Sequence, residues 1–308
     1  MPFLGAVVGK EFQTWLRGRF TFGLFGLLVL GLAVLALVMV LAILAPDSNA
    51  APTFFSASGS NVSTSNALVA NRALFLFGGV GVCVVLASAI LSAAVASSAF
   101  AAEREQGTLD LLLLQGPGSL HLIVAKVLSS VLFSLFLLVV SVPLFASAWM
   151  FGGVPISTAL ILVVVVLAVT VFFSALGVFF AAALRSALAA AIFAQVTAAL
   201  LLFGTLGAYL AAALAGGNTF LRPLLWLNPV IALLSAGGTA TESFARIVPP
   251  TYRGAISLPP TTFPFGVIPA WATGGVIWLL LAICFMVAAS VLIDPCHPVR
   301  WRTSPATR

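Results

Sequence analysis

The sequence predicts an all-α integral membrane protein with six transmembrane helices in a single transmembrane domain covering residues 1–308. Hydrophobic residues make up 62% of the chain and charged residues only 6%, whereas a soluble domain carries about 25% charged residues. The mean hydropathy is +1.23, which excludes a water-soluble core. The apolar runs are continuous rather than alternating, and this favours helices over a β-barrel in lipid.

Intervals without any charged residue locate the membrane spans. Each interval exceeds the roughly 20 residues that a helix needs to cross the hydrocarbon layer. The longest one, between Lys126 and Arg185, holds two helices separated by the turn-forming sequence Phe-Gly-Gly-Val-Pro at residues 151–155. The predicted spans cover residues 21–45, 73–100, 121–151, 158–183, 187–215 and 268–293.

Six spans place both termini on the same side of the membrane, together with the segments around Glu103–Lys126 and Arg185. That side carries nine of the 13 lysines and arginines. The other side carries only Arg72, Arg222, Arg246 and Arg253. Because positive residues concentrate on the cytoplasmic side, both termini are predicted to be cytoplasmic. This asymmetry accounts for the net charge of +6, so no nucleic-acid partner is expected.

Three segments outside the spans have a distinct character. Residues 1–20 place apolar side chains on one face and polar ones on the other, which predicts an amphipathic helix in the cytoplasmic interface. Residues 46–71 are rich in Ser, Asn, Ala and Thr and predict an external loop. Residues 216–267 form the external segment before the last span. Within it, Leu221–Ala236 is apolar but interrupted by an Asn-Pro pair, which favours a re-entrant or interfacial helix pair.

The most informative segment covers residues 103–118 and contains three of the seven acidic residues. It predicts a helix end at Gly107, a new start at Thr108, a short helix, a Gly-Pro-Gly break and a further helix from Ser119. The leucines after Thr108 are too few to cross the membrane, so they are expected to pack under it or in a partner's groove. The residues alone leave a second interpretation open, a tight connector whose charges only set the topology.

This segment resembles the signature of the permease subunits of type-2 ATP-binding-cassette transporters. The signature runs Glu, a basic residue, Glu, any residue, Gly-Thr-Leu, an acidic residue, leucines, a proline, a Ser or Thr, and then a Lys. The matching residues are Glu103, Arg104, Glu105, Gly107, Thr108, Leu109, Asp110, Leu112, Leu113, Pro117, Ser119 and Lys126. Gly118 departs from the bulkier residue usual at its position. The resemblance implies that the nine matching residues from Glu103 to Leu113 form a coupling helix that binds an ATPase subunit, and that Leu221–Ala236 closes the external side.

An ATP-driven function requires a nucleotide site, and the sequence encodes no phosphate-binding loop. Its only lysines are Lys10 and Lys126. Lys10 has Leu4 where the loop needs its first glycine and Glu11 where it needs Ser or Thr, and Lys126 follows Ala125. The resemblance therefore implies that ATP and Mg bind to a separate ATPase subunit and that this chain is not an enzyme and holds no cofactor. It also implies a second permease subunit, identical or related, in contact with membrane lipids.

A secondary transporter or channel without an ATPase partner is the main alternative. Proton or sodium coupling commonly leaves ionisable residues inside the membrane, and no predicted span has one near its centre. An enzyme is a weaker alternative, because the only histidines, His121 and His297, lie near the cytoplasmic surface. The candidate path-lining residues are Gln195, Thr197, Thr205 and Tyr209. Such residues in membrane helices are more often packing contacts.

The predicted activity is export of a hydrophobic or amphiphilic molecule, because an uncharged and apolar path suits such a cargo better than an ionic one. The expected location is the cell membrane, in particular a bacterial inner membrane, where the chain is a multi-pass protein.

Overall fold

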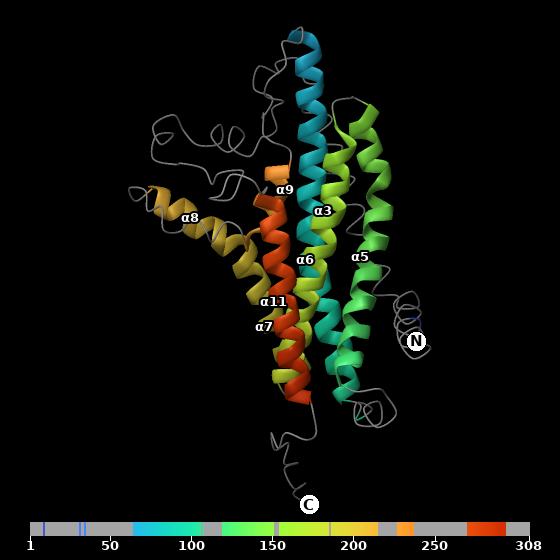
Figure 1. The fold of residues 1–308 in the computed structure, drawn as a ribbon, viewed down its shortest axis with the longest axis vertical. Helices are drawn as coiled ribbons and strands as arrows, with labels where there is room; N and C mark the ends of the chain where they lie inside the picture. The colour runs from blue at the N-terminus through green and yellow to red at the C-terminus, as the bar shows by residue number, and fades with distance from the viewer. Residues whose placement is uncertain are drawn as a thin grey trace, which may run out of the picture.

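The computed structural model describes residues 64–105, 107, 119–150, 154–184, 186–214, 227–236 and 270–293, together with Gly9, Gly31 and Val34. In these residues all regular structure is helical and no strand is present. The elements in chain order are α3 (Thr64–Glu105), α5 (Ser119–Met150), α6 (Ile156–Ala183), α7 (Ala187–Ala199), the π-helix η2 (Leu200–Gly204), α8 (Thr205–Leu214), α9 (Pro229–Ala236) and α11 (Ala270–Ile293). Figure 1 shows α3, α5, α6 and α11 running along the long axis of the bundle, with α8 directed away from them.

Five described helical segments are long and apolar enough to cross a membrane. They cover Leu76–Ala101, Ser119–Met150, Ile156–Ala183, Ala187–Ala208 and Trp271–Ile293, and they correspond to the predicted second to sixth spans. The predicted first span (21–45) and amphipathic helix (1–20) lie outside the described residues, except for Gly9, Gly31 and Val34, which are helical. The helical fold of the described part is therefore confirmed, while the total of six spans and the side of each terminus stay predictions.

The second span is longer than predicted at its N-terminal end. Helix α3 begins at Thr64, so residues 64–71, which were expected to belong to an external loop, are helical. The loop prediction was wrong here because it used composition alone. Extending an existing helix adds a hydrogen bond for each residue without a new nucleation step. Ala67 and Ala70, which have the highest intrinsic helix propensity, favour this extension.

The third span ends and the fourth span begins on either side of the predicted turn sequence Gly-Gly-Val-Pro. Helix α5 ends at Met150 and α6 begins at Ile156. The indole Nε1 of Trp149 donates a hydrogen bond of 3.0 Å to the carbonyl oxygen of Val154, which ties the end of α5 to the residues before α6. Pro155 occupies the position before the first helical residue, where its missing N–H costs no helix hydrogen bond.

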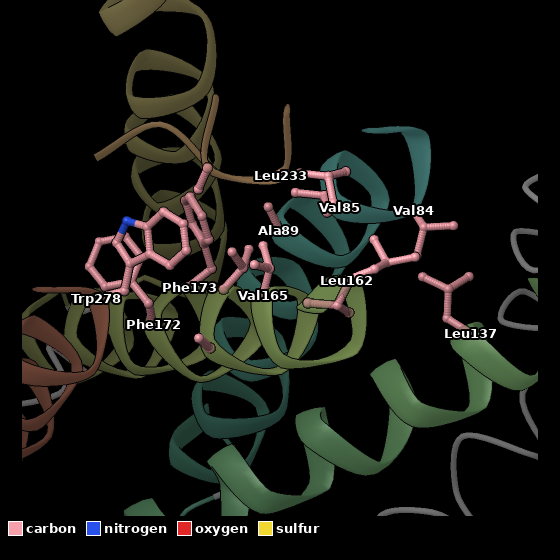
Figure 2. Packing of buried hydrophobic residues seen from close by; sticks show 14 of the residues in the cluster. Val84, Val85, Ala89, Leu137, Leu162, Val165, Phe172, Phe173, Leu233 and Trp278 are labelled. Carbon is pink, nitrogen blue, oxygen red and sulfur yellow. The ribbon is translucent and has the colours of Figure 1, made fainter. Parts of the chain in front are cut away.

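Helix α6 is the centre of the bundle, because it packs against α3, α5, α7 and α11. Figure 2 shows the cluster that its side chains form with the neighbouring helices, with Trp278 of α11 and Phe172 of α6 at one end and Leu137 of α5 at the other. In lipid, helices associate through close packing rather than through removal of apolar surface from water. The buried side chains of α6 therefore position the other helices by their shape.

Gly177 allows α6 and α3 to approach until their backbones touch. A Cβ atom at this position would lie 2.6 Å from the carbonyl oxygen of Ala93 and 3.3 Å from the backbone nitrogen of Ser97. Ala93 and Ser97 are themselves small and fully buried. Small residues on both sides of a crossing are typical of tightly packed membrane helices, so this contact fixes the distance between the two central helices.

The fifth span is not the uniform α-helix that the sequence predicted for residues 187–215. Helices α7 and α8 are joined by η2, one turn of π-helix at Leu200–Gly204. A π-turn widens the helix and disturbs the regular i to i+4 hydrogen bonds, and it is a recognised cause of a change in helix direction. Figure 1 shows α8 leaving the bundle beyond this turn.

Candidate functional site

The predicted coupling segment, residues 103–118, begins in the last turn of α3. Gly107 has a φ of +68°, the left-handed conformation that glycine adopts without a steric penalty. Its N–H donates to the carbonyl oxygen of Arg104 at 3.1 Å, a hydrogen bond typical of a glycine-capped helix end. The predicted helix end at Gly107 is thereby confirmed, and α5 begins at Ser119 as expected. Thr108, Leu109, Asp110, Leu112 and Leu113, and the side chain of Glu105, lie outside the described residues.

Glu103, four residues before Gly107, forms an ion pair with Lys126 of α5. The Nζ atom of Lys126 donates to Oε1 of Glu103 at a distance of 2.8 Å. The Lys126 side chain is 1% exposed and that of Glu103 is 15% exposed. A charge removed from solvent to this extent needs an opposite charge and hydrogen bonds to be tolerated. The pair therefore joins α3 to α5 at the end of the bundle where the coupling segment connects them.

Arg104, the next residue, contacts a third helix. Its Nη1 atom donates to the carbonyl oxygen of Ala181 at 2.7 Å. Ala181 lies in the last turn of α6, where carbonyl groups have no intrahelical donor and the helix dipole places partial negative charge. The guanidinium group therefore satisfies and neutralises the C-terminal end of α6.

Ala181, which accepts the hydrogen bond from Arg104, belongs to a cluster of buried apolar side chains at this end of the bundle. The cluster comes from α3, α5, α6, α7 and α11. It consists of Ala96, Phe100, Ala101, Leu122, Ile123, Val178, Ala181, Ala182, Ala190 and Ala289. Ionic interactions are stronger where water is displaced by apolar side chains, and an unpaired charge in such a place is correspondingly costly.

A second polar site lies near the other end of α11. Asn228 is completely buried and its side-chain amide connects two elements. Its Nδ2 atom donates to the carbonyl oxygen of Leu202 at 2.7 Å and to Oγ1 of Thr205 at 2.9 Å. Its Oδ1 atom accepts from the backbone N–H groups of Val230 at 2.9 Å and Ile231 at 3.4 Å. Asn228 is thus the N-cap of α9 and also binds the π-turn of the fifth span.

The Asn-Pro pair explains why α9 starts where it does. Pro229 is the first helical residue, where its fixed φ and missing N–H are tolerated. Leu227 directly precedes Asn228, and its carbonyl oxygen accepts a hydrogen bond of 3.1 Å from Nε1 of Trp278, a buried side chain of α11. With eight residues, α9 is too short to cross the membrane, consistent with the predicted interruption of this segment.

The structure describes the side chains of three of the four candidate path-lining residues. Gln195 is half-buried and its Nε2 donates to the carbonyl oxygen of Ile90 in α3 at 2.9 Å. Thr205 is buried against Asn228, and Thr197 is half-buried on α7. The side chain of Tyr209 lies outside the described residues. Gln195 and Thr205 have the geometry of packing contacts between elements, and a path-lining role for these residues stays a prediction.

A buried hydroxyl pair joins α5 to α6 in the middle of the bundle. Oγ1 of Thr170 lies 2.8 Å from Oγ of Ser134 and 2.7 Å from the carbonyl oxygen of Val166. A hydroxyl group has one proton, so the arrangement satisfies all three atoms if Thr170 donates to the carbonyl and accepts from Ser134.

Sequence reasoning missed the pairing of Lys126 with Glu103 and the role of Asn228. The signal for Lys126 was available: a lysine preceded by Leu122 and Ile123 and followed by Val127 lies on an apolar helix and needs a partner. For Asn228, the Asn-Pro pair indicated a helix start but not the contact with residues 202–205, because that contact depends on tertiary structure.

The arrangement of long apolar helices joined by buried polar contacts defines a multi-pass membrane protein. The sequence model of the family described as "ABC-2 family transporter protein" matches residues 5–293. The chain belongs to this family, and it is a permease of an ABC transporter. A comparison with curated protein sequences returned no significant match.

Proposed function

We propose that this chain is the permease subunit of an ABC exporter that moves a hydrophobic or amphiphilic molecule, driven by ATP hydrolysis in a separate subunit. The observation that carries the proposal is the family match over residues 5–293, with the Glu-Arg-Glu-x-Gly-Thr-Leu signature located at the connection between α3 and α5. The glycine-capped helix end at Gly107 supports the proposal, because it ends α3 before the remaining residues of the signature. In the proposal this segment, residues 103–118, is the contact with the ATPase.

In the proposal, ATP hydrolysis takes place in the partner subunit. ATP and Mg bind to the ATPase subunit, and this chain carries no catalytic or cofactor-binding residue. A second permease subunit, an identical copy or a related chain, completes the transport path, and membrane lipids cover the apolar faces. The plasma membrane, in particular a bacterial inner membrane, is the proposed location.

The charge distribution favours an apolar cargo over an ion. No charged residue occurs in Ile156–Ala183, Ala187–Leu214 or Ala270–Ile293. In the sequences of α3 and α5 the charged residues are Arg72, Glu103, Arg104, Glu105 and Lys126, towards the ends of these helices. An ion crossing the membrane would need polar or charged ligands to replace its hydration shell.

Cells that express the native transporter, with its ATPase, should accumulate less of at least one lipophilic dye or labelled lipid than cells that lack it. The reason is that an exporter lowers the steady-state level of its cargo. Accumulation measured across a broad panel of amphiphilic probes checks this expectation. Identical accumulation across the panel would reject export of this class of substrate.

Reversing the charge at Glu105 is expected to lower ATPase stimulation by the permease by about tenfold, the effect of losing one interfacial charge contact. The spans should remain folded, because Glu105 is the last residue of α3. The measurement is ATP hydrolysis by the partner subunit with Glu105→Lys reconstituted in lipid vesicles. Asp294→Lys, with the same charge change on the predicted cytoplasmic side, is the matched control. Equal stimulation by both variants would count against coupling through this segment.

A further inference from the structure

The ion pair between Glu103 and Lys126 joins the two helices, α3 and α5, that the coupling segment connects. Glu103 lies four residues before Gly107, where α3 has ended, and Lys126 lies seven residues after Ser119, where α5 begins. The two charged groups are 2.8 Å apart, so the helices on either side of the segment are held together at its base. The segment between them therefore starts and finishes at fixed points.

The burial of the pair argues against direct contact between Glu103 and another protein. The Lys126 side chain is 1% exposed, and its ammonium group uses a carboxylate oxygen of Glu103 as a hydrogen-bond acceptor. A partner that withdrew Glu103 from this position would break the 2.8 Å hydrogen bond to the ammonium group of Lys126, a side chain almost completely removed from solvent. Separating a buried pair in this way is strongly unfavourable.

Arg104 extends the same arrangement to the fourth predicted span. Its guanidinium donates to the carbonyl oxygen of Ala181, which lies in the last turn of α6. Successive residues of a helix point about 100° apart, so Glu103 and Arg104 reach α5 and α6 respectively from one turn of α3. The end of α3 is thereby joined to the ends of both neighbouring helices.

We infer that Glu103, Arg104 and Lys126 are positioning residues of this chain, which hold the coupling segment in place and join its movement to α3, α5 and α6. This inference rests on the proposed function and divides the signature into two parts. Glu103 and Arg104 act within the chain, and contact with the ATPase falls to the residues from Glu105 onward. A displacement of the docked segment is then transmitted to three helices together.

Charge reversal of each partner, alone and combined, tests the inference. Glu103→Lys and Lys126→Glu each place two like charges at the base of the segment. Each is expected to lower ATPase stimulation by about tenfold or more, and the double variant should recover to within about threefold of the native value. Direct binding of Glu103 to the ATPase predicts the opposite, that the double variant is as defective as Glu103→Lys. Native-like stimulation by both single variants would also overturn the inference.

A second measurement reports positioning without the ATPase. A nitroxide attached to Gln106→Cys, in a variant with Cys83, Cys284 and Cys296 replaced by alanine, monitors the mobility of the segment by electron paramagnetic resonance. Mobility should increase in the single reversal variants and return towards the native value in the double variant. Glu103→Gln, which retains the size of the side chain, supplies a milder variant if a reversal does not fold. Unchanged mobility in a folded Glu103→Gln variant contradicts the positioning role.

Leu112→Glu separates this inference from the proposed function. The substitution lies in the predicted coupling helix, so it should abolish ATPase stimulation. It leaves Glu103 and Lys126 in place, so the nitroxide signal should stay native. Full stimulation by Leu112→Glu would reject the coupling role of the segment. Loss of stimulation in Leu112→Glu with no defect in either charge-reversal variant would reject the positioning role alone.

Discussion

Replacing Gly177 by valine is expected to prevent the helix bundle from forming its native packing. A Cβ atom would lie 2.6 Å from the carbonyl oxygen of Ala93, and this oxygen belongs to the backbone of α3 and cannot rotate away. Relief of the clash requires the backbones of α3 and α6 to move apart at this crossing. Overpacking of a tight interior costs about 1–3 kcal/mol, and the upper end of this range is expected when the backbone itself must move. Size-exclusion chromatography in mild detergent should show little monodisperse protein.

Two glycine substitutions serve as controls for this expectation. Gly207→Ala adds a Cβ atom that has no heavy atom within 4 Å, so its thermal midpoint should match the native protein. Gly81→Ala places its Cβ 3.1 Å from the tip of the Leu233 side chain, which can adjust by changing rotamer. The thermal midpoint of Gly81→Ala should lie between those of Gly177→Val and Gly207→Ala. A native thermal midpoint for Gly177→Val would contradict the observed helix contact.

Replacing Asn228 by alanine is expected to lower the free energy of unfolding substantially. The substitution removes the N-cap of α9 and leaves the carbonyl oxygen of Leu202 without the amide donor that it has in the native protein. Loss of a cap costs about 1 kcal/mol and loss of the two hydrogen bonds that the amide donates about 1–3 kcal/mol, so the expected destabilisation is about 2–4 kcal/mol. The measurement is the unfolding free energy of the purified chain in mixed detergent and lipid.

Asn228→Ser separates the two contributions. Serine still caps a helix but is too short to reach the π-turn, so it should recover only the part due to the cap. Protease cleavage or hydrogen exchange near residues 200–205 should increase in both variants, because the contact with Leu202 and Thr205 is lost in each. Equal stability of Asn228→Ser and the native protein would indicate that the contact with the π-turn contributes little.

Predictions from the sequence were most successful where one physical property dominates. Long uncharged intervals placed the five described spans within a few residues of their observed limits, apart from the N-terminal end of α3. Gly107 and Ser119 were correctly identified as the end of one helix and the start of the next, because glycine and serine have strong preferences at helix ends.

Features that depend on contacts between distant residues were not predictable in the same way. The π-turn at Leu200–Gly204 has no local signal, and the structure relates it to Asn228, more than 20 residues later. The partner of Lys126 lies 23 residues earlier, on the far side of the coupling segment. Composition places a charge near a helix end, but only the packing of α3 against α5 determines whether that charge faces a partner, lipid or water.

Identification of the proteins that co-purify with this chain tests whether it works with an ATPase subunit. The tagged protein is extracted in a mild detergent, and its partners are identified by mass spectrometry beside the Glu105→Lys variant. A subunit bearing a phosphate-binding loop should accompany the native chain and be reduced with the variant. Purification of the chain alone, or only with copies of itself, under several gentle conditions would argue against an ATP-driven permease and favour a secondary transporter or channel.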